Sequence, residues 1–439
     1  MTLKFIPEIH FKRTAIGEIP KDWEVKKIKD FYNLKYGITV SSNVDGNCRL
    51  LRQTDLKEGT IDPASIPYAE IEIDKIEKYL LKEDDLVISR IANVGSIGYV
   101  DFRILKSVDK PLIFGSYLLK FEKVKEIHNK FTFYFLFSSQ MQDYIKSIAE
   151  GSTRQNTNAK VAGEFPLCIP PSFDEQSRIA TVLSWFDDLI ENKKRQNEIL
   201  EKTAMAIFKS WFVDFEPFQN EEFVYSEELG REIPKGWEVK AIGDISQIEK
   251  GLSYKSDELS EDEKEGEIFI TLKIFQRGGG FRPEYKYYIG NRYKREHITY
   301  DGDLVIALTD MTSDARVVGA PALVILPPDK TKGILSLDAA KLMIPDHIKD
   351  YLYLCLKESQ EENATFANGV NVLHLNLALF KKGKYILLPP THILQRFHEL
   401  VEPMFKKIIL NQKEIMILRK ARDALLPKLV FGKIRVVEI

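Results

Sequence analysis

The sequence has little of what membrane, secreted and metal-dependent proteins need. Its 439 residues contain only three cysteines, Cys48, Cys168 and Cys355, which lie far apart and form no CxxC pair. This argues against a disulfide framework or a structural zinc site and fits a reducing compartment. No apolar run approaches the roughly 18 residues of a membrane span, and the N-terminus lacks the apolar core of a signal peptide. We therefore expect a cytoplasmic protein that does not enter a membrane.

Motifs of catalysis are also absent. There is no GxxxxGK[ST] phosphate loop, and the seven histidines are scattered without a metal-binding spacing such as HExxH. No Pro-Pro pair is followed by the aromatic residue of amino-methyltransferases, and no Asp/Glu-x-Lys follows Pro345-Asp346 as in nucleases. We predict no catalytic residue, metal site or cofactor in this chain. The net charge of −2 is not that of a basic nucleic-acid-binding domain, so contacts with nucleic acid would depend on local patches.

What the sequence does contain is an internal duplication. Residues 18–26 read EIPKDWEVK and residues 232–240 read EIPKGWEVK, an offset of 214. Ordered matches follow at offsets that reach only 219: Gly37 with Gly251, Asp85–Ile88 with Asp303–Ile306, Gly151 with Gly369, and Pro170-Pro171 with Pro389-Pro390. Surface insertions produce such a drift, and the period is far longer than that of solenoid repeats. The pattern predicts a duplicated pair of domains.

Each half begins with about 150 residues of mixed character and ends in a long helix. Short β-rich runs at 86–89 and 116–121 precede a helical stretch at 130–148, which is matched by 348–357. Long helical runs are predicted at 173–215 and 392–433, and Pro403 should kink the second or delay its start. The predicted boundaries are 1–172, 173–216, 217–390 and 391–439.

Both long runs have apolar residues at heptad spacing. The first seam holds Ile179, Leu183, Phe186, Ile190, Leu200, Ala204, Ile207 and Trp211; the second holds Phe397, Val401, Met404, Ile408, Ile415, Leu418, Leu425 and Leu429. Polar residues interrupt them: Lys193 and Asn197 in the first, Asn411 and Arg422 in the second. Residues 174–216 have 6 Lys or Arg and 9 Asp or Glu (net −3), whereas 391–439 have 10 and 5 (net +5). We expect the two helices to pair; the alternative is that each seam packs only on a globular domain.

Several strings, in this order and duplicated, resemble the specificity subunits of type I restriction–modification systems over nearly the whole chain. The strings are Ile19-Pro20-x-x-Trp23, Leu51–Leu56, Asp85–Arg90, Gly151–Asn156, Pro166–Pro171, Glu175-Gln176, and Ile179, Leu183, Asp187-Asp188 and Ile190. The second half departs from the pattern, because Gly369-Val370-Asn371-Val372 replaces the Gly-Ser-Thr-Arg string and only Gln395 survives of Glu175-Gln176.

The resemblance implies an α+β protein with two similar mixed α/β target-recognition domains. Two long helices, paired as an antiparallel coiled coil, would separate them in a pseudo-two-fold internal repeat. Each domain would read one half of a split, asymmetric double-stranded DNA target. Two methyltransferase subunits would dock on the chain and methylate adenine, and restriction subunits would join for cleavage. These partner subunits, not this chain, would use S-adenosylmethionine, ATP and magnesium.

Residues that could read bases need paired donors and acceptors on loops above a stiff sheet. The candidates are Arg52, Gln53, Arg90, Asn93, Arg154, Gln155 and Asn156 in the first domain, and Lys273, Gln276, Arg277, Arg316 and Asn371 in the second. Arg52 and Arg90 could instead be ion-pair partners of Asp55 or Asp85. Arg154 could contact phosphate or the domain–helix junction.

Further alternatives stay open at this stage. Tyr36, Tyr68 and Tyr254 could lean on bases or belong to a core, and Gly278-Gly279-Gly280 could admit a close backbone or form a flexible turn. For the whole chain, the alternatives are an enzyme with an unrecognised site, the specificity module of a methyltransferase-only or other restriction system, and a coiled-coil adaptor that does not read DNA.

Overall fold

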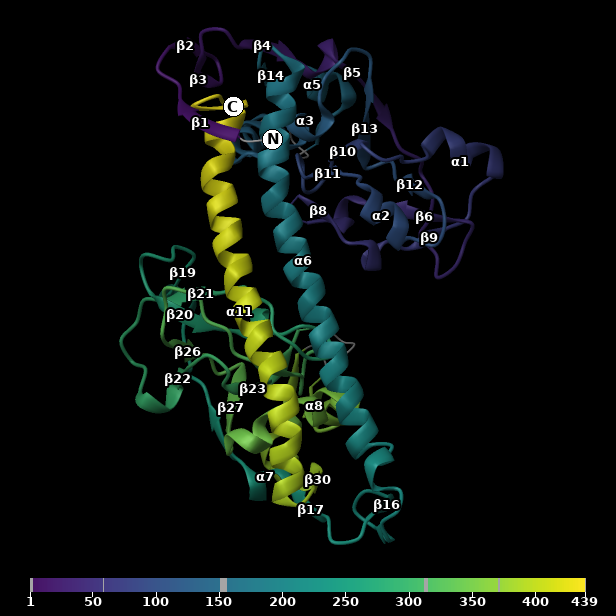
Figure 1. Ribbon diagram of the computed structural model, residues 1–439, viewed down its shortest axis with the longest axis vertical. Coiled ribbons are helices and arrows are strands. Elements are labelled where there is room, and N and C mark those ends of the chain that lie inside the picture. Colours follow the sequence, from purple (N-terminus) through teal and green to yellow (C-terminus); the bar gives the residue numbers. More distant parts are fainter. Residues whose placement is uncertain (1–2, 58, 151–155, 312–314, 370–371, 439) are drawn as a thin grey trace. The chain divides into compact units, whose positions relative to one another are not determined.

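The computed structural model describes residues 3–57, 59–150, 156–311, 315–369 and 372–438. The chain divides into two compact units: unit 1 holds residues 1–188 and 419–439, and unit 2 holds residues 189–418. The boundaries fall inside two long helices, α6 (Phe173–Phe212) and α11 (Thr391–Val430). Each unit therefore contains a part of both helices (Figure 1).

The two long helices confirm the prediction from heptad spacing. Each contains 40 residues, which is about 60 Å at 1.5 Å per residue. The expectation that Pro403 delays the second helix is wrong, because α11 begins at Thr391 and continues through the proline. The lost hydrogen bond costs about 3 kcal/mol, but Val401 and Phe405 on either side are buried in the core of unit 2, and this burial holds the helix together.

Within each unit the helices run antiparallel and meet through the polar residues that interrupt their seams. The pairs are Asp187 with Arg422 at 2.7 Å in unit 1, and Lys193 with Glu414 and Asn197 with Asn411 in unit 2, the last at 2.9 Å. Residue numbers rise along α6 as they fall along α11, which defines the antiparallel direction. Apolar seam residues such as Ile179 and Val401 are fully buried, so the predicted coiled-coil pairing is confirmed within each unit.

Unit 1 is built on a four-stranded antiparallel sheet in the order β11-β10-β13-β5. Its strands are β5 (Tyr32–Tyr36), β10 (Leu86–Ser89), β11 (Ile97–Tyr99) and β13 (Leu118–Lys123). A second sheet has the order β12-β6-β9, with β6 (Cys48–Leu51), β9 (Tyr68–Ala69) and β12 (Leu112–Phe114); β4 (Glu24–Lys27) pairs with β14 (Pro166–Ile169). The helices are α1 (Ile73–Tyr79), α2 (Phe102–Ser107), α3 (Asn129–Phe137), α4 (Ser139–Glu150) and α5 (Ala159–Gly163).

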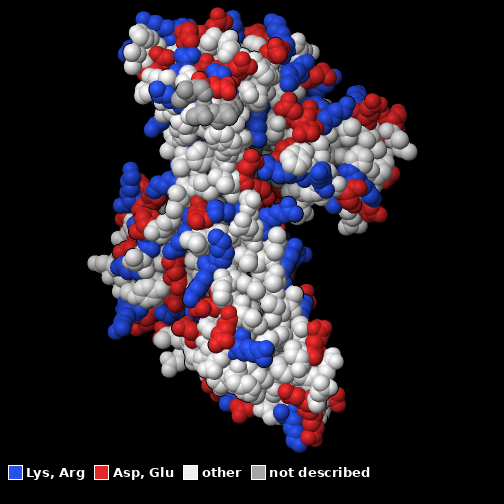
Figure 2. Space-filling model, viewed as in Figure 1, with Lys and Arg blue, Asp and Glu red and all other residues white. Residues whose placement is uncertain are grey.

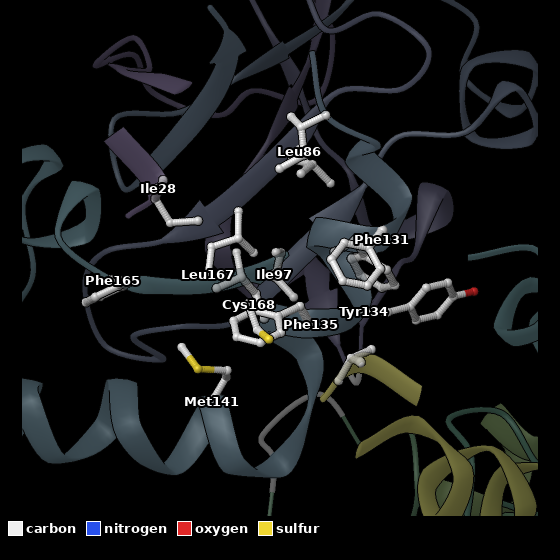
Figure 3. Close-up of a cluster of buried hydrophobic side chains, with 14 of the residues drawn as sticks. Ile28, Leu86, Ile97, Phe131, Tyr134, Phe135, Met141, Phe165, Leu167 and Cys168 are labelled. Carbon is white, nitrogen blue, oxygen red and sulfur yellow. The ribbon is translucent and has the colours of Figure 1, made fainter. Parts of the chain in front are cut away.

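The core of unit 1 lies between the four-stranded sheet, α3 and the helix pair. Strand β10 reads LVIS with all four residues buried, as expected for a central strand covered on both faces. Figure 3 shows Phe131 and Phe135 from α3 among Leu86, Ile97 and Leu167 from the strands. Residues of both long helices complete this cluster, so the helices form part of the domain core.

Unit 2 repeats this arrangement. Its four-stranded sheet has the order β18-β27-β23-β25, with β18 (Gln247–Lys250), β23 (Leu304–Ala307), β25 (Pro321–Leu323) and β27 (Ala339–Met343). A five-stranded sheet contains β19 (Leu259–Ser260), β20 (Glu267–Ile270), β21 (Lys286–Tyr288), β22 (Ile298–Thr299) and β26 (Gly333–Leu335). Strand β17 (Glu238–Ala241) pairs with β30 (Tyr385–Leu388), and β24 (Thr309–Asp310), β29 (Leu373–Leu375) and β28 (Ala367–Asn368) form a small sheet in this order. The helices of this unit are α7 (Ile242–Ile245), α8 (Asp346–Glu358), α9 (Gln360–Ala364) and α10 (Leu377–Gly383). The shared strand order confirms the internal repeat.

The segment that follows each long helix packs against the first residues of a repeat: the segment after α11 on the first repeat, and the segment after α6 on the second. In unit 1, Gly432 after α11 lies against Trp23, and β31 (Ile434–Glu438) pairs with β1 (Leu3–Pro7). In unit 2, Phe215 after α6 packs on Trp237 with a ring-centroid distance of 5.5 Å. Hairpins β2 (Phe11–Thr14)–β3 (Gly17–Pro20) and β15 (Phe223–Ser226)–β16 (Arg231–Pro234) also correspond. The C-terminal segment therefore belongs to unit 1, with the start of the chain.

Candidate nucleic-acid interface

One edge of the four-stranded sheet in unit 1 carries exposed side chains of the kind that contact nucleic acid. Strands β5 and β10 end at the edge where β11 and β13 begin, because neighbouring strands are antiparallel. Tyr36 ends β5, Arg90 follows β10 and Tyr117 precedes β13. The two tyrosines are 46% and 50% exposed, respectively. We call the loops at this edge the reading edge of unit 1.

Arg90 lies at the centre of this edge. Its Nε donates to the backbone oxygen of Ser116 at 2.8 Å, and its Nη1 lies 3.4 Å from Oδ1 of Asn156. The guanidinium carbon is 5.3 Å from the centre of the Tyr36 ring, within the range of a cation–π contact. The ion pair with Asp85 that the sequence left open is not formed; Asp85 pairs instead with Lys120 at 2.6 Å. Arg90 is therefore held at the edge by neutral groups.

The other candidates of the first domain divide into three groups. Asn93 is exposed in the turn between β10 and β11, and Asn156 bridges to Ile91, so both join Arg90 at the reading edge. Arg52 and Gln53 follow β6, whose end is tied to the same edge by a hydrogen bond from Gly115 N to Leu51 O at 2.9 Å. Two candidates, Arg154 and Gln155, lie outside the described residues.

Arg52 has a structural partner that explains its position. Its guanidinium donates to both oxygens of Asp55, at 2.8 and 3.1 Å, and to the backbone oxygen of Ser65 at 3.0 Å. The hydrogen bond with Asp55 raises the pKa of the guanidinium further above its ordinary value. Arg52 thus forms the internal ion pair that was the alternative to base reading. Beside it, Oε1 of Gln53 is buried without a hydrogen-bond partner among the described residues.

Unit 2 has the same backbone frame at the corresponding edge. Leu308 takes the place of Arg90: its N–H donates to Asp338 O at 2.7 Å, as that of Arg90 donates to Tyr117 O at 3.0 Å. The oxygen of Leu308 accepts from Leu375 N at 2.8 Å, as that of Arg90 accepts from Thr157 N at 2.9 Å. The two edges are therefore equivalent positions of the repeat.

Gly37 and Gly251, which are matched in the sequence, allow the backbone to pass closely at equivalent places in the two units. A Cβ added to Gly37 would collide with the backbone oxygens of Phe114 and Gly115, and one added to Gly251 with those of Leu335 and Ser336. In each unit the segment that links the two sheets passes directly over the glycine, so no larger residue fits.

The side chains on this common frame differ between the units. Arg90, Tyr117 and Asn156 of unit 1 correspond to Leu308, Asp338 and His374 of unit 2, because equivalent backbone hydrogen bonds and strand pairings join them. Asp338 accepts from the Tyr254 hydroxyl at 3.1 Å and the Thr309 hydroxyl at 3.2 Å. Burial and the nearby Asp338 carboxylate raise the pKa of Tyr254 to about 12, so this hydroxyl stays protonated and donates.

The sequence reasoning missed Tyr117, Asp338 and His374. His374 is exposed and pairs with Thr309 across β24 and β29, as Asn156 bridges to Ile91. The offset of 218 that links Gly151 to Gly369 also links Asn156 to His374, so the repeat itself was the signal that could have found it.

The candidates of the second domain surround a turn that follows β20. Lys273, Gln276, Arg277 and Arg316 are exposed, and Gly278 N donates to Arg316 O at 2.9 Å. The three glycines 278–280 have positive φ values of 75°, 100° and 117°, and Gly280 N donates to Pro321 O at 2.8 Å. The glycines lie in a turn whose backbone is fixed by hydrogen bonds. The last candidate, Asn371, lies outside the described residues.

Three further features of the described residues concern surface charge, metal ligands and membrane spans. On the face shown in Figure 2, Lys and Arg side chains are interspersed with Asp and Glu. In the part of the chain that the structure describes, no group of three or more His, Cys, Asp or Glu could hold a metal ion. Among the described helices, none combines the length and the hydropathy of a membrane span.

Comparison with known proteins identifies the family. Residues 20–202 and 234–418 match the model of the type I restriction modification DNA specificity domain, and the chain belongs to this family. It is 37% identical over 457 aligned positions to the specificity subunit of the type I restriction enzyme MjaIX of Methanocaldococcus jannaschii, covering 100% of this chain and 99% of the relative. The specificity subunit of HindI from Haemophilus influenzae is 25% identical over 427 positions, covering 81% and 88%.

A solved structure supports the fold. The crystal structure of the type I restriction–modification S subunit from M. genitalium matches 96% of this chain and 99% of its own, with a TM-score of 0.55 and 18% sequence identity. Together with the two matches to the family model, this confirms the predicted α+β fold with two recognition domains.

Proposed function

We propose that this chain is the DNA-reading specificity subunit of a type I restriction–modification complex, in which each repeat reads one half of a two-part target. The observation that carries the proposal is the pair of reading edges, which share one backbone frame and differ in side chains. Unit 1 has Arg90 and Asn156 where unit 2 has Leu308 and His374, so the hydrogen-bonding groups differ at equivalent positions. Because base edges are distinguished by donor and acceptor pattern, different side chains on one frame favour different half-sites, and hence an asymmetric target.

Family membership and the exposed apolar residues of the long helices support docking of methyltransferase subunits. Ile199 on α6 is 55% exposed, and Ile417, its counterpart at offset 218 on α11, is 54% exposed. Leu410, one heptad before Ile417 on α11, is 50% exposed. The pair Ile199 and Ile417, exposed at equivalent positions of the two repeats, suits two copies of one partner. We assign these faces to two methyltransferase subunits.

The catalytic steps belong to partner subunits in this proposal. The methyltransferase subunits would use S-adenosylmethionine, and restriction subunits would use ATP and magnesium. The sequence provides no recognised catalytic motif, and the chain would act in the cytoplasm, where its DNA target lies. Purified chain incubated with DNA, S-adenosylmethionine, ATP and magnesium should neither methylate nor cleave; activity of the clean chain would contradict this assignment.

The test of the proposed function is sequencing of genomic methylation with and without this gene. Loss of one two-part motif on deletion is the expected result, and an unchanged set of motifs would refute it. Docking is tested with Ile199→Asp and Ile417→Asp, which should weaken co-purification of the methyltransferase subunit. The control Lys202→Asp changes an exposed residue on the same helix that is already polar and should leave assembly intact.

A further inference from the structure

We infer that Arg90 reads a guanine in the half-site bound by the first repeat, and that the second repeat has no equivalent reader at this position. The inference rests on the proposed function and deepens it, since it assigns one base type to one side chain. It follows from three observations: how the guanidinium is held, what the second repeat has in its place, and which base matches the donors that remain.

The guanidinium of Arg90 is held in one orientation before DNA arrives. Ser116 O accepts from Nε at 2.8 Å, Asn156 Oδ1 lies 3.4 Å from Nη1, and the Tyr36 ring lies beneath it. Tyr36 is fixed in turn, because its hydroxyl accepts from Ala159 N at 3.1 Å. Fixing a long side chain in advance lowers the entropy that binding would cost. Arg90 is thus arranged as a rigid donor at the reading edge.

A purely structural role does not explain this arginine. Leu308 stands at the same place in unit 2, and the same backbone hydrogen bonds form around it. The backbone hydrogen bonds at this edge therefore form without a guanidinium. A contact that both readers needed, such as one common phosphate, would call for the same side chain in both repeats. The difference between Arg90 and Leu308 is instead what two readers of different sequences require.

Guanine is the base that matches the donors left on Arg90. Arginine has five N–H donors, and its commonest specific contact is the bidentate pair with O6 and N7 of guanine in the major groove. Protein acceptors engage Nε and approach Nη1, while Nη2 has no acceptor among the described residues. The end of the guanidinium, Nη1 with Nη2, is the pair of donors that can face the base. Leu308 is 5% exposed and has no such donors.

The test exchanges the side chain for the one that the second repeat carries. Arg90→Leu is assembled with its methyltransferase partners, and methylation is measured on a library randomised at every position of the wild-type motif. At one guanine of the first half-site, discrimination against other bases should fall roughly 5- to 150-fold, while the second half-site stays unchanged. Arg90→Lys keeps the charge but not the planar fork and should lose part of this discrimination. It also serves if the leucine variant does not fold.

A matched control removes an arginine elsewhere. The Arg13 side chain is 92% exposed, so Arg13→Ala subtracts the same charge and should leave the base preferences unchanged. Equal loss at all sequences, with a salt dependence reduced by about one counterion, would overturn the inference in favour of a phosphate contact. Unchanged discrimination in both Arg90 variants would also overturn it. Absence of any two-part motif for the wild-type complex would instead refute the proposed function itself.

Discussion

Insertion of one heptad into each long helix should change the distance between the half-sites that the complex recognises. Asn197 and Asn411 are hydrogen-bonded at 2.9 Å, so insertions beside them enter at matched heights. Duplicating residues 190–196 and 408–414, which correspond at offset 218, keeps the spacing of the seam. Seven residues add about 10.5 Å to each helix, equal to about three base pairs at 3.4 Å each. Three pairs also turn the far half-site by roughly 100°.

The added length and rotation together predict the size of the effect. A reader displaced by three base pairs loses its half-site, and each mismatched pair costs about 1–3 kcal/mol. We expect binding to the native site to weaken by about 4 kcal/mol, roughly 1000-fold. The assay is binding of the assembled complex to DNA with gaps lengthened pair by pair, together with thermal unfolding to verify the fold. Unchanged affinity for the native gap, in a folded variant that still binds its partners, would show that the helices do not set the spacing.

Three further perturbations probe single features of the fold. Gly251→Ala should lower the free energy of unfolding by about 3 kcal/mol, because the new methyl group meets the backbone of Leu335 and Ser336; denaturant unfolding measures this, and a neutral result would contradict the close approach. Arg435→Ala should cost about 3 kcal/mol, since it leaves the buried Glu175 carboxylate without its partner at 2.5 Å; wild-type stability would refute the ion-pair network. Burial raises the pKa of the Cys168 thiol to about 12, so alkylation at pH 8 should require unfolding; rapid labelling of the native thiol would contradict its burial.

Features that repeat at fixed spacing could be read from the sequence. Heptad spacing gave the two long helices, and the polar interruptions at Asn197 and Asn411 proved to be partners of one another. The internal offset gave the duplicated domains and singled out Gly37 and Gly251 before their close approaches were known. The expected delay of the helix start at Pro403 was wrong because propensity is local, whereas burial of the residues around the proline depends on the tertiary fold.

The reading edge could be predicted only in part. Tyr36, Arg90 and Asn156 are separated by more than fifty residues at each step, and the sheet alone brings them together. Residue type suggested Arg90 and Asn156, but no local pattern placed Tyr36 beneath the guanidinium. Arg52 was ambiguous because the sequence does not distinguish an arginine paired with Asp55, three residues away, from an arginine that is free on a loop.

The central claim is that each repeat reads its own half of the target, and exchange of one reader tests it most directly. Residues 23–169 would be replaced by the corresponding segment of a relative with a different target, and the methylation motif of the resulting complex would be determined across a genome. The account predicts a motif in which one half-site and the gap are those of the parent and the other half-site is new. A change in both half-sites, or a motif unchanged in both, would contradict it.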